Sequence, residues 1–228
     1  NNASRTPGEV SASLRGLGMA VDDASVVTSA QAGASLLARE LPSGSAVLAV
    51  GGPGVAAALV EVGLTLTREP IDARAVLQGW GRDVRVDDLA RAAIAVSGGA
   101  RWVATNTDRT LPTNQGLVPG NGTLVSAVAE ASGQVPEVVG KPHAPLYRAA
   151  ADRLGVPPDR LLAVGDRLDT DIVGATAIGA DSLWVLGGVD GFVSLVGSSA
   201  RPSYAAHDLR ALLEPPAWVE RVDRTIWS

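Results

Sequence analysis

Three aspartates follow an apolar run in quick succession. Leu161–Val164 leads into Gly165 and Asp166, and Asp169 and Asp171 come soon after. A short apolar run that ends at a turn signal predicts a buried strand, and groups just past the carboxyl end of a strand line the ligand crevice of an open α/β sheet. Crowded carboxylates repel one another unless a cation offsets their charge, and Mg²⁺ typically binds one or two carboxylates together with phosphate oxygens. This stretch alone fits a Mg²⁺ site and a solvated acidic turn, with Asp171 capping a helix, about equally well.

A lysine at the end of the preceding apolar run favours the metal and phosphate interpretation. Pro136–Gly140 is typical of a short strand, Lys141 follows it, and Pro142 ends it because proline has no backbone N–H to donate. We predict a helix over His143–Leu154. In such a βαβ unit, Lys141 and Asp166 would lie at the same edge of one parallel sheet. A metal-binding carboxylate beside an ammonium group suits a phosphate dianion, because the metal and the lysine can each take one side of it.

These residues and their flanks resemble the haloacid dehalogenase (HAD) superfamily. Gly140–Pro142 and Gly165–Asp171 resemble the third and fourth motifs of that superfamily. Asn1–Pro7 is similar to the segment that follows the second motif in the NagD-like branch, class IIA. Ala104–Asp108, together with Leu117–Gly122, resembles the cap-domain signature of that branch. The resemblance covers nearly the whole chain, with its motifs in the family's order.

The resemblance implies an α/β fold with a Rossmann-like core, a parallel sheet and an inserted α/β cap domain of the C2 type. It places the core in residues 1–27 and 134–228 and the cap in residues 28–133. The family's nucleophile lies in an N-terminal Asp-x-Asp motif, upstream of the segment that Asn1–Asn2 resembles. The sequence contains no such segment, and its single methionine is Met19. We therefore expect the chain to be a fragment that begins inside the second motif.

The resemblance further implies a Mg²⁺-dependent phosphomonoester hydrolase that forms a phosphoaspartyl intermediate. An aspartate in the missing segment would attack phosphorus, and a second one would act as acid and base. Lys141 would neutralise charge on the nucleophile and the phosphoryl oxygens, Asp166 would ligate Mg²⁺, and Asp171 would orient that shell or bind it through water. Asp169 falls where the family pattern varies, and no role is implied for it. The fragment alone is expected to be inactive.

Substrate binding is implied for Asn1, Asn106 and Asp108, alongside Lys141. Asn1 would contact the phosphate, and the other two would help the cap to select a small phosphorylated metabolite. The residues themselves also favour a simpler interpretation, an Asx turn from Asn106 to Asp108, which these residue types form readily. Both interpretations are equally supported. Caps of this type often pair, so a homodimer through the cap is open by analogy alone.

Two other classes of function compete with the hydrolase. A non-catalytic HAD-fold binding or regulatory protein would account for the missing nucleophile, provided that the native chain begins near Asn1. A nucleotide-cofactor protein would use the glycine-rich turn Gly51–Gly54 after the apolar strand Ala46–Val50. That turn matches neither the dinucleotide fingerprint nor the P-loop, so a tight turn between strand and helix is favoured.

The composition is that of a globular protein and excludes several partners. The chain has 228 residues, 46% of them hydrophobic and 19% charged, with a net charge of −5. No dense run of Lys and Arg is present, which argues against nucleic acid. There are no cysteines, as in a protein of the reducing cytoplasm. No apolar run approaches the roughly 20 residues that span a bilayer, so we predict a cytoplasmic protein without a membrane partner.

The remaining patterns predict alternating helices and strands. Helix starts are marked by capping threonines, strands by short apolar runs, and loops by Gly, Asn and Pro. The predictions are helices from Thr6 to Gly16 or Gly18, Thr28–Glu40, 86–97 and Thr123–Ala131, strands at 26–27, 75–80 and 182–186, loops at 114–116 and 119–122, and an apolar tail, Trp218–Trp227, packed on the core.

Overall fold

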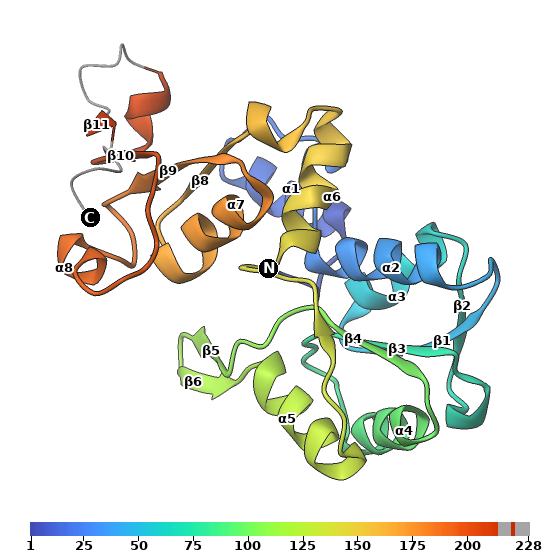
Figure 1. Cartoon of the computed structure of the whole chain (residues 1–228). Helices are drawn as coiled ribbons and strands as arrows, with labels where there is room; N and C mark the ends of the chain where they lie inside the picture. The colour runs from blue at the N-terminus through green and yellow to red at the C-terminus, as the bar shows by residue number, and fades with distance from the viewer. Residues whose placement is uncertain (214–219, 222–228) are drawn as a thin grey trace. The chain divides into compact units, whose positions relative to one another are not determined.

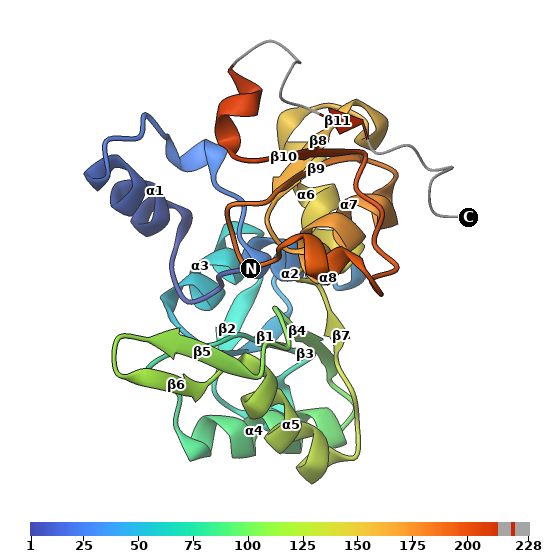
Figure 2. The same cartoon turned by 90° about the vertical axis from the view of Figure 1, so that its left-hand side faces the viewer.

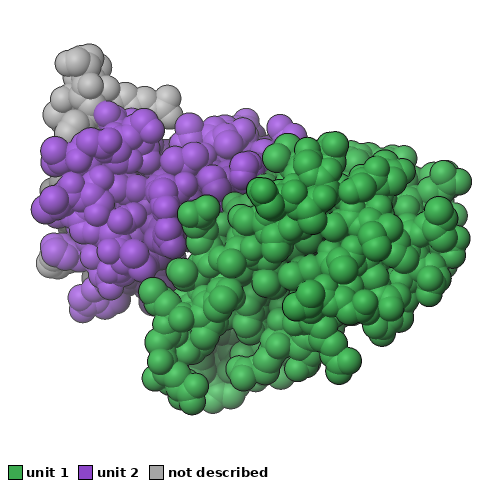
Figure 3. Space-filling view, turned by 90° about the horizontal axis from the view of Figure 1, so that it is seen from below, with its two compact units in different colours: residues 1–140 green, residues 141–228 purple. Residues whose placement is uncertain are grey.

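The computed structural model describes residues 1–213 and 220–221. The chain divides into two compact units, Asn1–Gly140 (unit 1) and Lys141–Ser228 (unit 2), which Figure 3 distinguishes by colour. Each unit contains its own mostly parallel sheet with helices, so the predicted α/β class is confirmed. Residues 1–27 share unit 1 with residues 28–133, and the division into core and cap stays a prediction. None of the helices in the described part of the chain could cross a membrane.

Unit 1 is built around a five-stranded parallel sheet with the order β2-β1-β3-β4-β7. Helices connect its strands, as parallel pairing requires. In Figures 1 and 2, α2 and α3 lie on one side of the sheet and α4 and α5 on the other. The elements are β1 (Ala46–Val50), β2 (Thr65–Thr67), β3 (Ala75–Gln78), β4 (Arg101–Ala104), β7 (Glu137–Val138), α2 (Ser29–Glu40), α3 (Pro53–Glu61), α4 (Val86–Ser97) and α5 (Asn121–Ser132).

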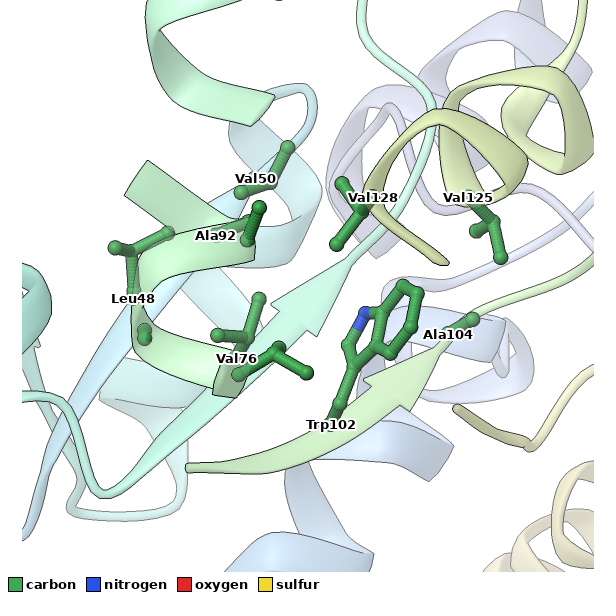
Figure 4. Close-up of a cluster of buried hydrophobic side chains, with 11 residues drawn as sticks. Leu48, Val50, Val76, Ala92, Trp102, Ala104, Val125 and Val128 are labelled. Carbon is green, nitrogen blue, oxygen red and sulfur yellow. The ribbon is translucent and has the colours of Figure 1, made fainter. Parts of the chain in front are cut away.

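One part of the core of unit 1 lies between this sheet and helices α4 and α5. Trp102 is 3% exposed, and its indole lies beside Val125 and Val128 of α5 in Figure 4. The indole N–H donates to Gln78 Oε1 at 3.1 Å, so the buried polar atom of the tryptophan is satisfied. Truncating a buried Trp to Ala typically costs about 3–5 kcal/mol, which makes this side chain a main support of the sheet.

The two N-terminal helices begin where their capping residues predict. Thr6 precedes α1 (Pro7–Gly16) and Thr28 precedes α2, and each threonine forms a capping box with the residue three positions later. Both predicted starts are confirmed. The predicted strand end at Val26–Val27 is wrong, because Asp22 instead caps a single 3₁₀ turn just before it.

The glycine-rich turn before α3 has a packing role. A Cβ on Gly52 would lie 2.4 Å from the carbonyl oxygen of Ser4, and one on Gly54 would lie 2.3 Å from that of Arg5. Real Cβ atoms do not approach a backbone oxygen so closely. Glycine therefore lets the N-terminal segment cross the start of α3, which gives this turn a reason in the fold rather than in nucleotide binding.

A hairpin that was not predicted surrounds the predicted loop at 114–116. Strands β5 (Thr110–Thr113) and β6 (Gly116–Pro119) pair antiparallel, apart from the main sheet, as Figure 2 shows. Both strands are largely exposed, so their sequence has no alternation of apolar and polar residues to indicate them. Helix α5 also starts earlier than predicted, at Asn121 rather than Thr123, with Gly120 as its N-cap.

Unit 2 contains a four-stranded sheet with the order β11-β10-β9-β8. Strands β8, β9 and β10 are parallel, and β11 runs antiparallel to β10. Trp184 is fully buried between Leu168 and Ile172, with Phe192 at its edge in a T-shaped contact of 5.8 Å between ring centroids. The elements are β8 (Leu162–Gly165), β9 (Asp181–Val185), β10 (Tyr204–Ala206), β11 (Glu220–Arg221), α6 (Ala144–Leu154), α7 (Val173–Ile178) and α8 (Phe192–Leu195).

Two predictions for the strands around Lys141 are wrong. Strand β7 pairs with β4 in the sheet of unit 1, so β7 and β8 do not form one βαβ unit in a common sheet. Strand β8 is not buried: Leu162 is 44% and Val164 38% exposed. The reason is that β8 is an edge strand, paired among the described residues with β9 alone. The predicted tail, Trp218–Trp227, lies outside the described residues except for 220–221.

Candidate functional site

Lys141 and Asp171 form an ion pair in unit 2. The Lys141 ammonium donates to Asp171 Oδ1 at 2.7 Å, and the backbone N–H of Arg167 donates to Asp171 Oδ2 at 3.2 Å. Asp171 is only 8% exposed, so its carboxylate meets the usual condition for a buried charge, which is to be paired and hydrogen-bonded. Both oxygens of Asp171 are engaged. This arrangement favours a role for Asp171 in holding Lys141 in place over a role as a direct metal ligand.

The end of β8 is shaped to receive the Asp171 side chain. A Cβ on Gly165 would lie 2.3 Å from the Cγ of Asp171, so only glycine leaves room for the carboxylate there. Asp171 lies inside a wide, π-type helical turn, Leu168–Ile172, whose two apolar ends are buried against Trp184. The alternative in which Asp171 is a solvated N-cap is wrong, because Asp171 is buried and Ile172 occupies the N-cap position of α7.

Asp166 is half-buried and oriented by the loop between β9 and α8. The backbone N–H of Val189 donates to Asp166 Oδ2 at 2.8 Å, and that of Asp190 donates to the Asp166 carbonyl at 3.2 Å. Gly188 provides the space, since a Cβ there would lie 2.2 Å from Oδ2. Oδ1 takes no part in these two hydrogen bonds. Asp166 therefore presents one oriented carboxylate oxygen at the carboxyl end of β8.

That oxygen fits one position in the ligand shell of Mg²⁺, which prefers hard oxygen ligands and keeps several sites for water or phosphate. Across the described ranges, no group of three or more His, Cys, Asp or Glu side chains converges to hold a metal by itself. Asp169, the third aspartate of the stretch, instead binds the Arg167 guanidinium through Nε and Nη2, at 3.0 and 2.7 Å. These hydrogen bonds hold the pKa of Asp169 below its usual range.

Asn1, Asn106 and Asp108 lie together in unit 1. The Asn106 amide donates to the Asn1 carbonyl at 3.1 Å, and the Asn1 amide lies 3.4 Å from Asp108 Oδ2. The Asp108 N–H donates to Asn106 Oδ1 at 3.2 Å, which is the Asx turn that these residue types favour. The Asx turn is thus confirmed, while a role of the three residues in substrate binding stays a prediction.

Several residues near these groups were not predicted. Asn121 is 1% exposed, and its amide donates to the Asn106 carbonyl at 2.7 Å, which fixes the loop that carries Asp108. The sequence held a partial signal, because Asn121 falls in the segment that resembles the cap signature. In unit 2, the Val189 amide and the Tyr147 hydroxyl contact the Asp166–Asp171 stretch. Neither contact has a sequence signal, because each depends on which loop or helix lies beside the turn.

Two family models match the chain. A haloacid dehalogenase-like hydrolase model matches residues 1–65, and a HAD-hydrolase-like model matches residues 138–212. D-glycerol 3-phosphate phosphatase of Mycobacterium tuberculosis is 47% identical over 215 residues, which are 93% of this chain and 60% of that relative. Acid sugar phosphatase of Staphylococcus haemolyticus is 36% identical over 214 residues, 93% of this chain and 80% of that relative. The chain thus spans less than two thirds of the length of the mycobacterial relative.

Solved structures agree with these matches. The crystal structure of the glycerol phosphate phosphatase from Mycobacterium tuberculosis in complex with magnesium superposes with a TM-score of 0.88 at 47% identity, covering 92% of this chain and 65% of that one. The p-nitrophenyl phosphatase from Archaeoglobus fulgidus gives 0.84 at 30% identity, covering 93% and 82%. With such identity over four fifths of the length of several relatives, the chain belongs to the haloacid dehalogenase-like hydrolases, in their NagD-like class IIA branch.

Proposed function

We propose that this chain supplies the lysine and metal-binding part of a Mg²⁺-dependent phosphomonoester hydrolase. The observation that carries the proposal is the ion pair of Lys141 with the buried Asp171, close in sequence to Asp166, whose carboxylate is oriented by a backbone amide. A cation and an oriented carboxylate are the two components that a phosphate dianion and its metal need. The relatives named above as phosphatases support the same conclusion.

In this proposal, each residue has a separate task. Asp166 holds Mg²⁺, which when bound neutralises charge on the phosphoryl group. Lys141 binds phosphoryl oxygens, and since an ammonium has three N–H donors, its bond to Asp171 is compatible with further donation. Asp171 keeps the ammonium in place. The phosphoaspartyl intermediate, with a nucleophile encoded upstream of Asn1, is the finer part of the proposal and rests on the family resemblance.

The proposed substrate is a small phosphorylated metabolite with hydroxyl groups. Names of the relatives include glycerol phosphate, sugar phosphates and p-nitrophenyl phosphate, and the first two share hydroxyls next to the phosphoester. Asn1, Asn106 and Asp108 offer amide donors and a carboxylate acceptor, which can pair with hydroxyl groups. They are the proposed substrate-recognition residues. A homodimer through residues 28–133 and a cytoplasmic location stay predictions.

The proposal is tested by phosphate release from the complete protein. Purified protein is incubated with glycerol 3-phosphate, several sugar phosphates and p-nitrophenyl phosphate, each with Mg²⁺ and with EDTA. We expect release from at least one ester that depends on Mg²⁺. No release from any of them, together with binding of inorganic phosphate, would instead favour the non-catalytic binding protein.

A further inference from the structure

A phenol on α6 contacts the turn that carries Asp171. Tyr147 Oη lies 2.9 Å from the carbonyl oxygen of Thr170 and 3.2 Å from that of Asp171. A phenol has one proton, so the hydroxyl donates to one of these carbonyls or is shared between them. Burial raises the pKa of Tyr147, and the charge of Asp171 raises it further. The phenol therefore stays a donor throughout the neutral pH range.

The turn that Tyr147 contacts has an unusual backbone. The amides of Asp171 and Ile172 both point at the carbonyl oxygen of Arg167, at 2.9 and 3.3 Å. Wide turns of this kind are rare and are frequent at functional sites. This backbone fixes the direction of the Cα–Cβ bond of Asp171, and therefore the position from which its carboxylate reaches Lys141 and the Arg167 amide. A donor that holds the carbonyls of the turn also holds that position.

The ring of Tyr147 packs directly against Gly174 of α7. A Cβ on Gly174 would lie 2.1 and 2.4 Å from two ring carbons of Tyr147 and 2.6 Å from its hydroxyl oxygen, so glycine is needed for the tyrosine to reach the turn. Lys141 lies just before α6, and Tyr147 lies on it. One segment thus contacts Asp171 twice, through an ammonium on the carboxylate and a phenol on the backbone carbonyl.

We propose that Tyr147 is a positioning residue for the Lys141–Asp171 pair. By holding the carbonyls of Thr170 and Asp171, it keeps the Asp171 carboxylate between the Lys141 ammonium and the Arg167 amide. The consequence for turnover rests on the proposed function. The consequence for the geometry of the turn does not, and it can be measured without substrate or metal.

The test is the exchange of single backbone amides, followed by NMR in the complete protein. In Tyr147→Phe, the Arg167 amide, which donates to Asp171, is expected to exchange roughly three- to tenfold faster, as the loss of one hydrogen bond allows. The Val189 amide, which donates to Asp166 instead, should keep its rate. Tyr204→Phe is the matched control, because Tyr204 lies on β10 in the same unit and should change neither amide.

A second variant separates the position of the ring from the presence of the hydroxyl. Gly174→Ala keeps the phenol but displaces the ring, and it is expected to accelerate the Arg167 amide as Tyr147→Phe does. The proposal also predicts a lower kcat for both variants, by a similar factor, with the KM for the phosphoester within about twofold.

Two results would overturn the proposal. One is an unchanged Arg167 amide in Tyr147→Phe, and the other is equal acceleration of the Arg167 and Val189 amides, which would indicate general loosening. Absence of turnover in every form, the unsubstituted protein included, would refute the proposed function instead, while the exchange rates would still decide the role of Tyr147.

Discussion

The two sheets of this chain differ in how deeply their strands are buried. In unit 1, all four residues of β3 are buried, between α2 on one face and α4 on the other. In unit 2, β8 is an edge strand whose Leu162 and Val164 are more than a third exposed. Yet β8 leads directly to Asp166 and Asp171, the residues with the clearest chemistry. Burial of the strand is therefore not what orders the candidate site.

What orders each polar group is a local set of hydrogen bonds. In unit 1, the buried Asn121 amide holds the loop of Asn106. In unit 2, the Val189 amide orients Asp166, and Lys141 pairs with Asp171. We therefore expect that substitutions in unit 2 can change the geometry of the candidate site without a large change in stability. In unit 1, burial stabilises the sheet and also the loop of Asn106.

The largest expected difference is between two leucines. Leu77 in β3 is fully buried and Leu162 in β8 is 44% exposed. Leu77→Ala is expected to lower the free energy of unfolding by about 3–4 kcal/mol, within the usual range for buried leucines. Leu162→Ala should lower it by about 1 kcal/mol, because less area leaves water on folding. Urea denaturation followed by circular dichroism measures both; equal losses would show that β8 is covered in the protein measured.

The second-largest difference in stability is expected between the ion pairs of the two units. Lys141→Met leaves the buried Asp171 carboxylate without its partner and is expected to cost about 1–3 kcal/mol of stability. Arg101→Met is the comparable change in unit 1, where Arg101 pairs with two more exposed carboxylates, Glu40 at 3.0 Å and Glu137, and it should cost at most about 1 kcal/mol. Thermal denaturation compares them. A larger loss of stability in Arg101→Met than in Lys141→Met would contradict this expectation.

The smallest effect is expected at Asp208, a residue of unit 2 whose side chain is 41% exposed. Hydrogen bonds from the side chain and then the backbone of Arg210 lower the pKa of Asp208 from 3.8 to about 2. Because the folded-state pKa is depressed, any stability from this pair is fully present above about pH 4 and is lost as the pH falls through about 2. NMR titration should show that midpoint. Arg210→Gln should return it toward 3.8, and a midpoint unmoved by this substitution would exclude Arg210 as the cause.

Local signals explain the part of the fold that the sequence predicts well. The starts of α1 and α2 are set by threonines whose side chains cap the helix, and a cap is visible in sequence. The hairpin of β5 and β6 has no such signal, because its residues face solvent. The pairing of β7 was mispredicted, since a strand of two residues does not specify which sheet it joins.

The candidate site was predictable in its residue types but not in its contacts. The order of Lys141, Asp166 and Asp171 indicates the chemistry, and the structure places Lys141 against Asp171. The hydroxyl of Tyr147 and the amide of Val189 could not be predicted. Their role depends on α6 and on the loop after β9 lying beside the turn, and tertiary packing alone decides that.

The central claim is that Asp166 is the metal-binding aspartate of this stretch, and two isosteric variants of the complete protein test it most directly. Asp166→Asn is expected to lower Mg²⁺-dependent phosphate release at least tenfold, a barrier change of roughly 1.4 kcal/mol. Asp169→Asn, whose carboxylate is bound to Arg167, is the matched control and should stay within about twofold of the unsubstituted protein, a barrier change below about 0.5 kcal/mol. Turnover and Mg²⁺ dependence that are unchanged in Asp166→Asn, or lowered equally in both variants, would contradict the assignment.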